Sequence, residues 1–258
     1  MTEGDGAKKM DEDRVRISVV TVTYNSAATM AETVRSVLDQ TYPVYEYIII
    51  DACSTDDTLT IVEGYRADFE GIKAKLIVVS EPDEGIYDAM NKGTRLASGD
   101  IVGIINSDDR YEADALKVVA DTYRQDPFDL FWADIRMVRP DGRSFIKHAK
   151  DRSYATSRDW NHPTTFITKK IYEKYRYRCD NIHDDYDLIL RLKRDGARTR
   201  VVNKVLADFS MSGVSHKRSL KAAVSSIRTK YMIYRRCGYS RWYLIECIMV
   251  EAGKLIIG

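Results

Sequence analysis

The chain has few cysteines and no cysteine motif. Its four cysteines stand far apart without a Cys-X-X-Cys pair, at Cys53, Cys179, Cys237 and Cys247. Neither a zinc site nor a disulfide framework is therefore predicted. Because scattered free cysteines are typical of a reducing compartment, we expect a cytoplasmic protein.

An apolar leader is also lacking. Residues 1–14 are polar, so no cleaved signal peptide is expected, and we interpret them as a disordered arm. The formal net charge is only +1, so no overall field attracts nucleic acid and no such partner is predicted. With 44% hydrophobic and 31% charged residues in 258, the composition is that of one large globular domain with room for a helical appendage.

Acidic residues are missing from one long stretch, Phe209 to Ile245. The basic residues there are Lys217, Arg218, Lys221, Arg228, Lys230, Arg235, Arg236 and Arg241. Leu220–Arg236 has helical apolar spacing, and Trp242–Gly258 is largely apolar but shorter than the roughly 20 residues of a spanning helix. We expect residues 213–258 to form basic amphipathic helices on an anionic membrane surface. The alternative is an appendage packed on the preceding domain or on a second subunit of a homo-oligomer.

Strands and helices alternate through the first half of the chain. β-Branched and apolar runs predict buried strands at Ile17–Thr23, Tyr47–Ile50, Leu76–Val79 and Ile101–Ile105. A stretch with helical spacing follows each strand. Short crossovers of this kind produce parallel strands with helices on both faces. The predicted class is therefore α/β, with a Rossmann-like, mostly parallel sheet flanked by helices.

Polar side chains follow strands one, two and four of this sheet. They are Thr23-Tyr24-Asn25, Asp51, and the adjacent pair Asp108 and Asp109. The carboxyl ends of parallel strands meet at one edge, where open α/β sheets bind ligands. Two adjacent carboxylates repel each other unless a cation with oxygen ligands lies between them. A helix cap and turn is the alternative interpretation of Ser107-Asp108-Asp109 taken alone.

The second half mixes strand directions. Strands are predicted at Asp129–Val138 and Ser144–Ile146, around the turn Pro140–Gly142, and again at Pro163–Ile167. Antiparallel strands are thus added to the parallel core.

A helix is predicted near residues 181–192, and its first turn carries Asp184, Asp185 and Asp187. Carboxylates at a helix start are favoured by the helix dipole, so capping is one interpretation. Because one or two side chains suffice to cap a helix, we expect at least one of the three to be free for chemistry.

With these residues in view, the chain resembles the family 2 glycosyltransferases over Arg16 to Phe209. The blocks that carry the resemblance are Val22–Asn25, Ile49–Asp51 with Ser54–Asp56, Glu84–Gly93, Ala97–Asp100, Asn106–Asp109 and Asp185–Leu192. The resemblance implies a GT-A catalytic domain over residues 15–212 and inverting transfer from a nucleotide-sugar. The block Glu84–Gly93 looks like the branch that builds bacterial surface polysaccharides and glycolipids.

The resemblance also implies roles for matching residues. The nucleotide side would comprise Thr23, Tyr24, Asn25, Asp51, Asp88, Lys92 and Asp108, with Asp51 suited to accept from a uracil imide. Asp108 and Asp109 match the family's Asp-X-Asp region, which binds Mn²⁺ or Mg²⁺ and so stabilises the leaving nucleoside diphosphate. Asp185 aligns with the base that takes the proton of the acceptor hydroxyl.

Further residues receive weaker assignments. The acceptor side would comprise Trp160, His162, His183 and Asp184, and His216 is a candidate diphosphate ligand. The alternative interpretation of His162 and of His183 is an ordinary hydrogen-bonded histidine in a loop. Lys92 and Arg95 are candidate diphosphate ligands. The alternative is that both are solvated residues on a helix surface.

The predicted function is metal-dependent transfer of a sugar, most simply from a UDP-sugar, to a glycan or lipid-linked glycan at the inner membrane face. Two departures from the family, Asn106 and Ala52-Cys53, favour the alternative of a non-catalytic nucleotide- or glycan-binding protein. A nucleotidyltransferase would carry a Gly-rich basic loop after the first strand. Tyr24–Ala27 stands there instead.

Overall fold

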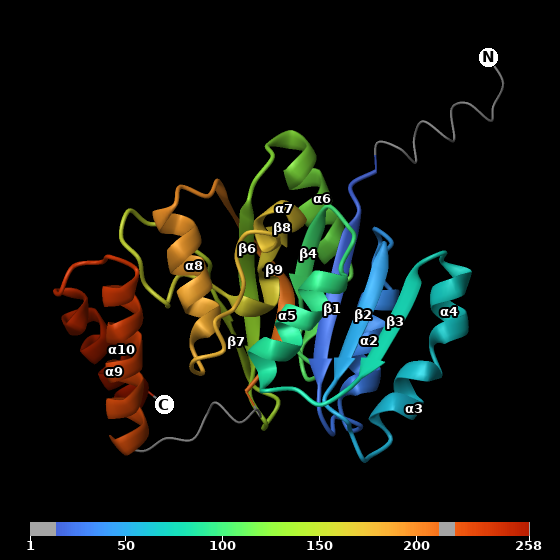
Figure 1. Cartoon of the computed structure of the whole chain (residues 1–258), viewed down its shortest axis with the longest axis horizontal. Helices are drawn as coiled ribbons and strands as arrows, with labels where there is room; N and C mark the ends of the chain where they lie inside the picture. The colour runs from blue at the N-terminus through green and yellow to red at the C-terminus, as the bar shows by residue number, and fades with distance from the viewer. Residues whose placement is uncertain (1–13, 212–219, 258) are drawn as a thin grey trace.

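The computed structural model describes residues 14–211 and 220–257. Its strands form one sheet in the order β3-β2-β1-β4-β8-β6-β9-β5, with β7 paired on β6 (Figure 1). The strands are β1 (Ile17–Thr23), β2 (Glu46–Asp51), β3 (Lys75–Ser80), β4 (Ile101–Ile104), β5 (Arg110–Tyr111), β6 (Leu130–Val138), β7 (Ser144–Lys147), β8 (Phe166–Thr168) and β9 (Thr199–Ser210). The helices are α2 (Met30–Leu38), α3 (Thr58–Glu63), α4 (Arg66–Gly71), α5 (Ile86–Leu96), α6 (Ala115–Gln125), α7 (Lys169–Tyr172), α8 (Asp184–Arg194), α9 (Leu220–Arg236) and α10 (Tyr243–Ile257), with a 3-10 turn η1 (His162–Thr164).

The parallel core is confirmed. β1 pairs in parallel with β2 and β4, and β2 pairs in parallel with β3. Every residue of β1 and β2 is buried, because helices cover both faces of the sheet. Ile17 and Val19 pack on the layer of α2, α4 and α6, whereas Val20 and Val22 face the layer of α5 and α8. The strand alternation thus builds two cores.

Antiparallel strands complete the sheet as predicted, since β8 runs antiparallel to β4 and β6, and β7 antiparallel to β6. Several details differ from the predictions, among them the short strand β5 and the short helix α7, which were not predicted. His162–Thr164 forms the turn η1, so the strand predicted from Pro163 begins only at Phe166. The helix predicted after Asp57 is divided into α3 and α4. Strand β9 was not predicted, because the polar Asn203-Lys204 step interrupts its apolar pattern and its pairing with β6 contains register shifts.

The C-terminal helices α9 and α10 pack as a pair at one end of the molecule, beside α8 (Figure 1). No helix within residues 14–211 and 220–257 is long and apolar enough to cross a membrane. The predicted boundary at residues 212–213 and the candidate ligand His216 lie outside the described residues, as does the predicted arm apart from Arg14. Arg14 is an ordered residue, since its guanidinium donates to the Pro43 carbonyl at 2.8 Å.

Candidate active site

The loops that follow β1, β2 and β4 meet at the carboxyl edge of the sheet. The amide of Asn25 donates to Ser54 Oγ at 2.8 Å, and the amide of Thr55 donates back to Asn25 Oδ1 at 2.8 Å. The hydroxyls of Ser26 and Ser107 lie 2.8 Å apart and join the first loop to the third. The predicted convergence on one edge is thus observed, and the loops hold one another in place.

Two residues of these loops have left-handed backbone conformations. Asn25 has φ 48° and Cys53 has φ 58°. Asn adopts this region more readily than most residues, whereas Cys53 stands where a glycine would be unstrained. The departure from the family at Ala52-Cys53 therefore keeps the turn but holds the exposed Cys53 in a strained conformation.

Asp51 anchors the loop after β2. The residue is fully buried. One carboxylate oxygen accepts from the Ser54 amide at 2.9 Å and from Ser80 Oγ at 2.7 Å, and the other accepts from Ser54 Oγ at 2.5 Å. In this conformation Asp51 is engaged by protein donors, so a direct bond to a nucleobase would require the loop to open.

Thr23 and Tyr24 end β1 in contrasting environments. The Tyr24 side chain is 61% exposed, so its ring offers an open apolar face for stacking. Thr23 is buried, and its hydroxyl has no hydrogen-bond partner among the described residues. Of Thr23, Tyr24 and Asp51, Tyr24 is the residue whose side chain is exposed to solvent and ligands.

Asp108 and Asp109 follow β4 and differ in burial. Asp109 is 1% exposed, and its Oδ1 accepts from the Ser210 amide at 2.9 Å. Its Oδ2 has no partner among the described residues, and neither has Asn106 Oδ1. Burial raises the pKa of Asp109 well above its ordinary value, and the nearby charge of Asp108 raises it further. Burial also raises the pKa of the half-buried Asp108.

This environment is suited to a divalent cation. The unpartnered oxygens of Asp109 and Asn106, with the Asp108 carboxylate on the same turn, are the hard ligands that Mg²⁺ and Mn²⁺ prefer. No group of three acidic, histidine or cysteine side chains arranged for a metal occurs in the described parts of the chain. Such ions are commonly bound by one or two carboxylates together with substrate phosphates, so the residues present fit that mode.

Asp88 and Lys92 stabilise the loop that follows β3. Lys92 Nζ lies 3.0 Å from Glu81 and 3.2 Å from Asp88, and it donates to the Pro82 carbonyl at 2.7 Å. Arg95 lies in the last turn of the same helix, α5, whose backbone there accepts from Lys169 Nζ at 3.1 Å. Because Lys169 directly follows β8, which pairs antiparallel with β4, this contact lies at the amino end of β4. The structure therefore does not bring Arg95 to the site.

The three aspartates in the first turn of α8 have separate roles. Asp184 is buried, and its carboxylate accepts from the Asp180 amide at 2.5 Å and from Asn181 Nδ2 at 2.6 Å. Asp187 is buried among arginines, with Arg191 Nε at 2.7 Å and Arg236 at 3.0 Å. Capping of the helix by all three is therefore not observed, and Asp185 is the aspartate that these two networks do not use.

Asp185 lies half-buried beside His162 and Tyr87. Its carboxylate accepts from the Tyr186 amide at 2.7 Å. Burial raises the pKa of Asp185, while the charge of His162 opposes this rise. Burial lowers the pKa of His162, and Asp185 partly restores it. A carboxylate that is poorly compensated and next to an imidazole is a candidate proton acceptor.

Two other residues predicted for the acceptor side, Trp160 and His183, make different contacts. The Trp160 ring stands edge-on to His162, with centroids 5.9 Å apart, and its Nε1 donates to Thr165 Oγ1 at 2.7 Å. His183 directly precedes α8, with Nε2 3.2 Å from Ser226 Oγ of α9. Trp160 and His162 are therefore brought to Asp185, whereas His183 joins α8 to α9.

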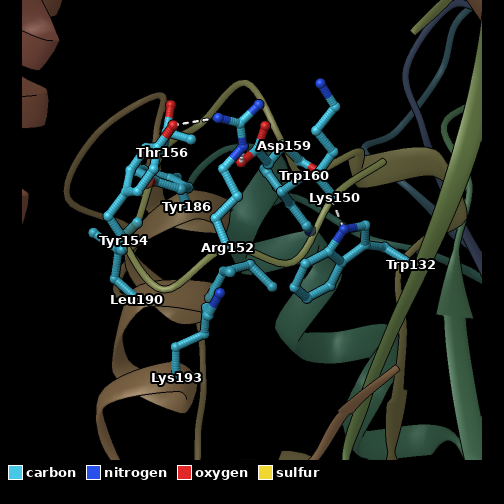
Figure 2. A pocket seen from close by; sticks show the side chains of 12 residues that line it. Trp132, Lys150, Arg152, Tyr154, Thr156, Asp159, Trp160, Tyr186, Leu190 and Lys193 are labelled. Carbon is cyan, nitrogen blue, oxygen red and sulfur yellow. Dashed lines mark hydrogen bonds and ion pairs between the residues drawn. The ribbon is translucent and has the colours of Figure 1, made fainter. Parts of the chain in front are cut away.

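A small pocket lined in part by Trp160 was not predicted. Its volume of about 10 Å³ is room for one water molecule. Figure 2 shows aromatic and basic side chains around it, among them Trp132, Arg152, Trp160, Tyr186 and Lys193. Their positions in the sequence give no common motif, because β6, α8 and the loop after β7 each contribute a part.

Comparison with known proteins assigns the family. The sequence model of glycosyl transferase family 2 matches residues 18–187, so the chain belongs to this family. It is 40% identical over 101 residues to the putative teichuronic acid biosynthesis glycosyltransferase TuaG of Bacillus subtilis, a match that covers 39% of each chain. It is 35% identical over 122 residues to a PGL/p-HBAD biosynthesis glycosyltransferase of Mycobacterium tuberculosis, covering 46% of each. The matches thus span less than half of these relatives.

Solved structures share the fold. S. aureus TarS 1–349 in complex with UDP-GlcNAc has a TM-score of 0.66 at 20% identity, over 93% of this chain and 72% of that one. The mannosyltransferase PcManGT of Pyrobaculum calidifontis, in complex with GDP-Man and Mn²⁺, has a TM-score of 0.63 at 17% identity, over 95% of this chain and 75% of that one. The family and the GT-A fold that the sequence resemblance implied are confirmed.

Proposed function

We propose that this chain is an inverting glycosyltransferase of surface polysaccharide biosynthesis, which transfers a sugar from a nucleotide-sugar to a hydroxyl of a glycan or lipid-linked glycan. One observation carries the proposal. Of three aspartates in the first turn of α8, Asp184 and Asp187 are fixed by loop amides and arginines, which leaves Asp185 with a raised pKa in a half-buried niche. That is the environment of a general base.

The donor would lie along the edge formed by the loops after β1, β2 and β4. The exposed ring of Tyr24 is suited to stack on a nucleobase, and Asn25 keeps its loop joined to Ser54. A UDP-sugar is our preferred donor. Support for a nucleotide-sugar comes from the similarly folded TarS, solved with UDP-GlcNAc, and from PcManGT, solved with GDP-Man.

A Mn²⁺ or Mg²⁺ ion would be held by Asp108 and Asp109, with the amide oxygen of Asn106 nearby. When bound, the ion supplies Lewis-acid stabilisation of the nucleoside diphosphate as it leaves. Asp109 contributes a carboxylate that burial has already stripped of water and whose Oδ2 lacks a donor among the described residues. The negative charge on such an oxygen is uncompensated in the free protein, and a bound cation would stabilise it.

The acceptor would approach from the side of Asp185. As the acceptor oxygen bonds to the anomeric carbon on the face opposite the leaving phosphate, Asp185 takes its proton, and the configuration inverts. The buried Trp160 ring packs edge-on against His162, and the charge of His162 lowers the pKa of Asp185. Asp184 supports this arrangement by fixing the loop before α8 rather than by touching the acceptor.

We place the reaction at the cytoplasmic face of the membrane, where the C-terminal helices would give peripheral contact. The basic stretch before Ile245 and the lipid-linked acceptor class favour this location.

A thermal-shift screen of UDP-, GDP- and dTDP-sugars, with and without Mn²⁺, tests the proposal. A ligand at 100 times its Kd stabilises the folded state by about 2.7 kcal/mol, which corresponds to a Tm rise of roughly 5–10 °C. We expect this rise with UDP-sugars and Mn²⁺ together, and release of UDP when acceptor is added.

Two other results would count against the proposal. Binding of UDP without hydrolysis or transfer would favour the non-catalytic binding protein that Asn106 and Cys53 suggest. An absence of any shift with all three donor classes would reject the donor site itself.

A further inference from the structure

The helices α9 and α10 have an inner face that is docked on the catalytic domain. Tyr234 of α9 is fully buried, and its hydroxyl lies 2.8 Å from that of Tyr186 on α8. Tyr243 of α10 accepts a hydrogen bond from the Ala155 amide at 3.1 Å. The predicted alternative of an appendage packed on the catalytic domain therefore describes this inner face.

The outer face of α10 is apolar and uncovered. Trp242, just before the helix, is 70% exposed and Met249 is 63% exposed, and the other large apolar side chains exposed there are Leu244, Ile245 and Ile248. Leu244 and Ile248 are four positions apart, as are Ile245 and Met249, so these side chains share one side of the helix. The opposite side carries the buried Cys247 and Val250. An uncovered apolar face of this kind marks a surface that contacts a partner.

The outer face of α9 mixes apolar and cationic side chains. Val224 and Met232 are exposed, and so are Arg228 and Arg235. Because these four residues are spaced by three and four positions, they form one stripe along the helix. Long basic side chains beside apolar ones are typical of helices that lie at a membrane interface.

The charges of the two helices are sorted between the faces. Both acidic residues of α10 are engaged inside: Glu246 accepts from Thr156 Oγ1 at 2.6 Å, and Glu251 lies 2.8 Å from the buried Lys230. Arg241, between the helices, is exposed like Arg228 and Arg235. The outward surface of the described part of α9 and α10 therefore carries apolar and cationic side chains and no carboxylate.

We infer that this outward surface of α9 and α10 docks on a lipid bilayer that contains anionic lipids. The apolar side chains of α10 would enter the region between headgroups and acyl chains, and the exposed arginines would contact the anionic headgroups. The inference rests on the membrane location in the proposed function and deepens it by naming the surface and the lipid chemistry. Docking itself requires no sugar transfer.

The charge distribution argues against two other occupants. In a two-fold dimer the same patch faces itself, so the exposed arginines of one copy would find no carboxylate on the outward surface of the other. Nucleic acid would engage the arginines but leave Trp242 and Ile245 exposed to water. An anionic bilayer satisfies both the charge and the apolar face.

Vesicle flotation of the full chain tests the inference, with neutral phosphatidylcholine vesicles compared with vesicles that also contain phosphatidylglycerol. We expect binding to the anionic vesicles that weakens as salt is raised. The pair Ile245→Ser and Met249→Ser should weaken binding roughly tenfold or more. The pair Arg228→Gln and Arg235→Gln should weaken it by about fivefold for each arginine.

Exposed cations elsewhere supply the matched control. Lys170→Gln with Lys174→Gln removes two exposed charges in and near α7 and should leave vesicle binding unchanged. Equal binding to both vesicle types, or to neither, would overturn the inference, as would a dimer in solution that the Ile245→Ser and Met249→Ser pair dissociates. The flotation experiment contains no sugar donor or acceptor, so it measures docking alone. A chain that fails to transfer sugar can therefore still pass this test, and the two failures are distinguished.

Discussion

Two pairs of neighbouring aspartates, Asp108 with Asp109 after β4 and Asp184 with Asp185 at the start of α8, look alike in the sequence. In each pair one carboxylate is buried and the other is half-buried. Asp184 accepts hydrogen bonds from Asp180 and Asn181, so its charge is compensated by the protein. Asp109 accepts one bond, from the Ser210 amide, and its Oδ2 has none among the described residues.

The difference separates a carboxylate that protein donors compensate from one whose second oxygen has no donor among the described residues. A buried carboxylate with several donors is stable by itself and positions its neighbours. One with an unsatisfied oxygen destabilises the free protein, and a bound cation removes that cost. Substitutions in the two pairs test this contrast, and the largest effect is expected at Asp185.

Asp185→Asn should lower transfer by about 10²–10⁴-fold, the usual contribution of a general base. Donor affinity should be unchanged, since Asp185 is assigned to the acceptor. Calorimetric titration with UDP, alongside the transfer rate, checks both parts. Normal transfer by the variant would place the base elsewhere.

Replacing Asp108 and Asp109 together by Asn should weaken the Mn²⁺-dependent binding of UDP by more than the roughly 10–100-fold that loss of a residue supporting a metal ligand costs. The readout is the Tm rise with UDP and Mn²⁺, which should match that of the unaltered chain in EDTA. A full Mn²⁺-dependent rise in the double variant would contradict the metal assignment.

Single Asn substitutions at the two buried positions should change stability in opposite directions. Asp184→Asn places an amide donor among backbone donors and should lower the free energy of unfolding by about 1–3 kcal/mol. Asp109→Asn should raise the Tm in EDTA, because burial raises the pKa of Asp109 and its ionised form destabilises the fold. The stability gained by Asp109→Asn should be largest above the raised pKa of Asp109 in the folded state, where the carboxylate is ionised. The gain should vanish below the pKa of the unfolded chain, about 3.9, where the carboxyl is protonated in both states.

Thermal unfolding of both variants in EDTA at pH 4 and pH 8 measures these changes. A lower Tm for Asp109→Asn at pH 8 would show that the Ser210 contact outweighs the buried charge.

The parallel core was predictable because the residue pattern that defines each of its strands is continuous in the sequence. Ile17–Thr23 and Tyr47–Ile50 are unbroken apolar runs, and the turn residues after them mark the strand ends. Strand β9 was not predictable in this way, since its polar Asn203 is stabilised by Asp134, a residue distant in the sequence.

The site was predictable only as a set of residue types. The sequence predicted that carboxylates gather at the carboxyl edge of the sheet, but the side chains and amides that hydrogen-bond to them come from elsewhere in the chain. Ser80 engages Asp51 across 29 positions, and Arg236 of α9 reaches Asp187 across 49. Hydrogen bonds of this range arise from tertiary packing, so no local pattern separates Asp185 from its neighbours.

The smallest expected effect concerns the pH dependence of Asp185. The base must be ionised, so kcat/KM should fall as pH drops through the raised pKa of Asp185. The charge of His162 lowers that pKa, and His162→Gln removes it. The acid limb of the pH profile should therefore move to higher pH in this variant, with the rate on the alkaline plateau less affected.

His148→Gln is the matched control, because His148 is bound to Asp134 at 2.7 Å rather than placed beside Asp185. Its acid limb should coincide with that of the unaltered chain. A uniform loss of kcat/KM across the pH range in His162→Gln, without movement of the limb, would assign His162 to acceptor contact instead. Comparison of His162→Gln with His148→Gln thus separates an electrostatic effect on the base from the general effect of losing a histidine.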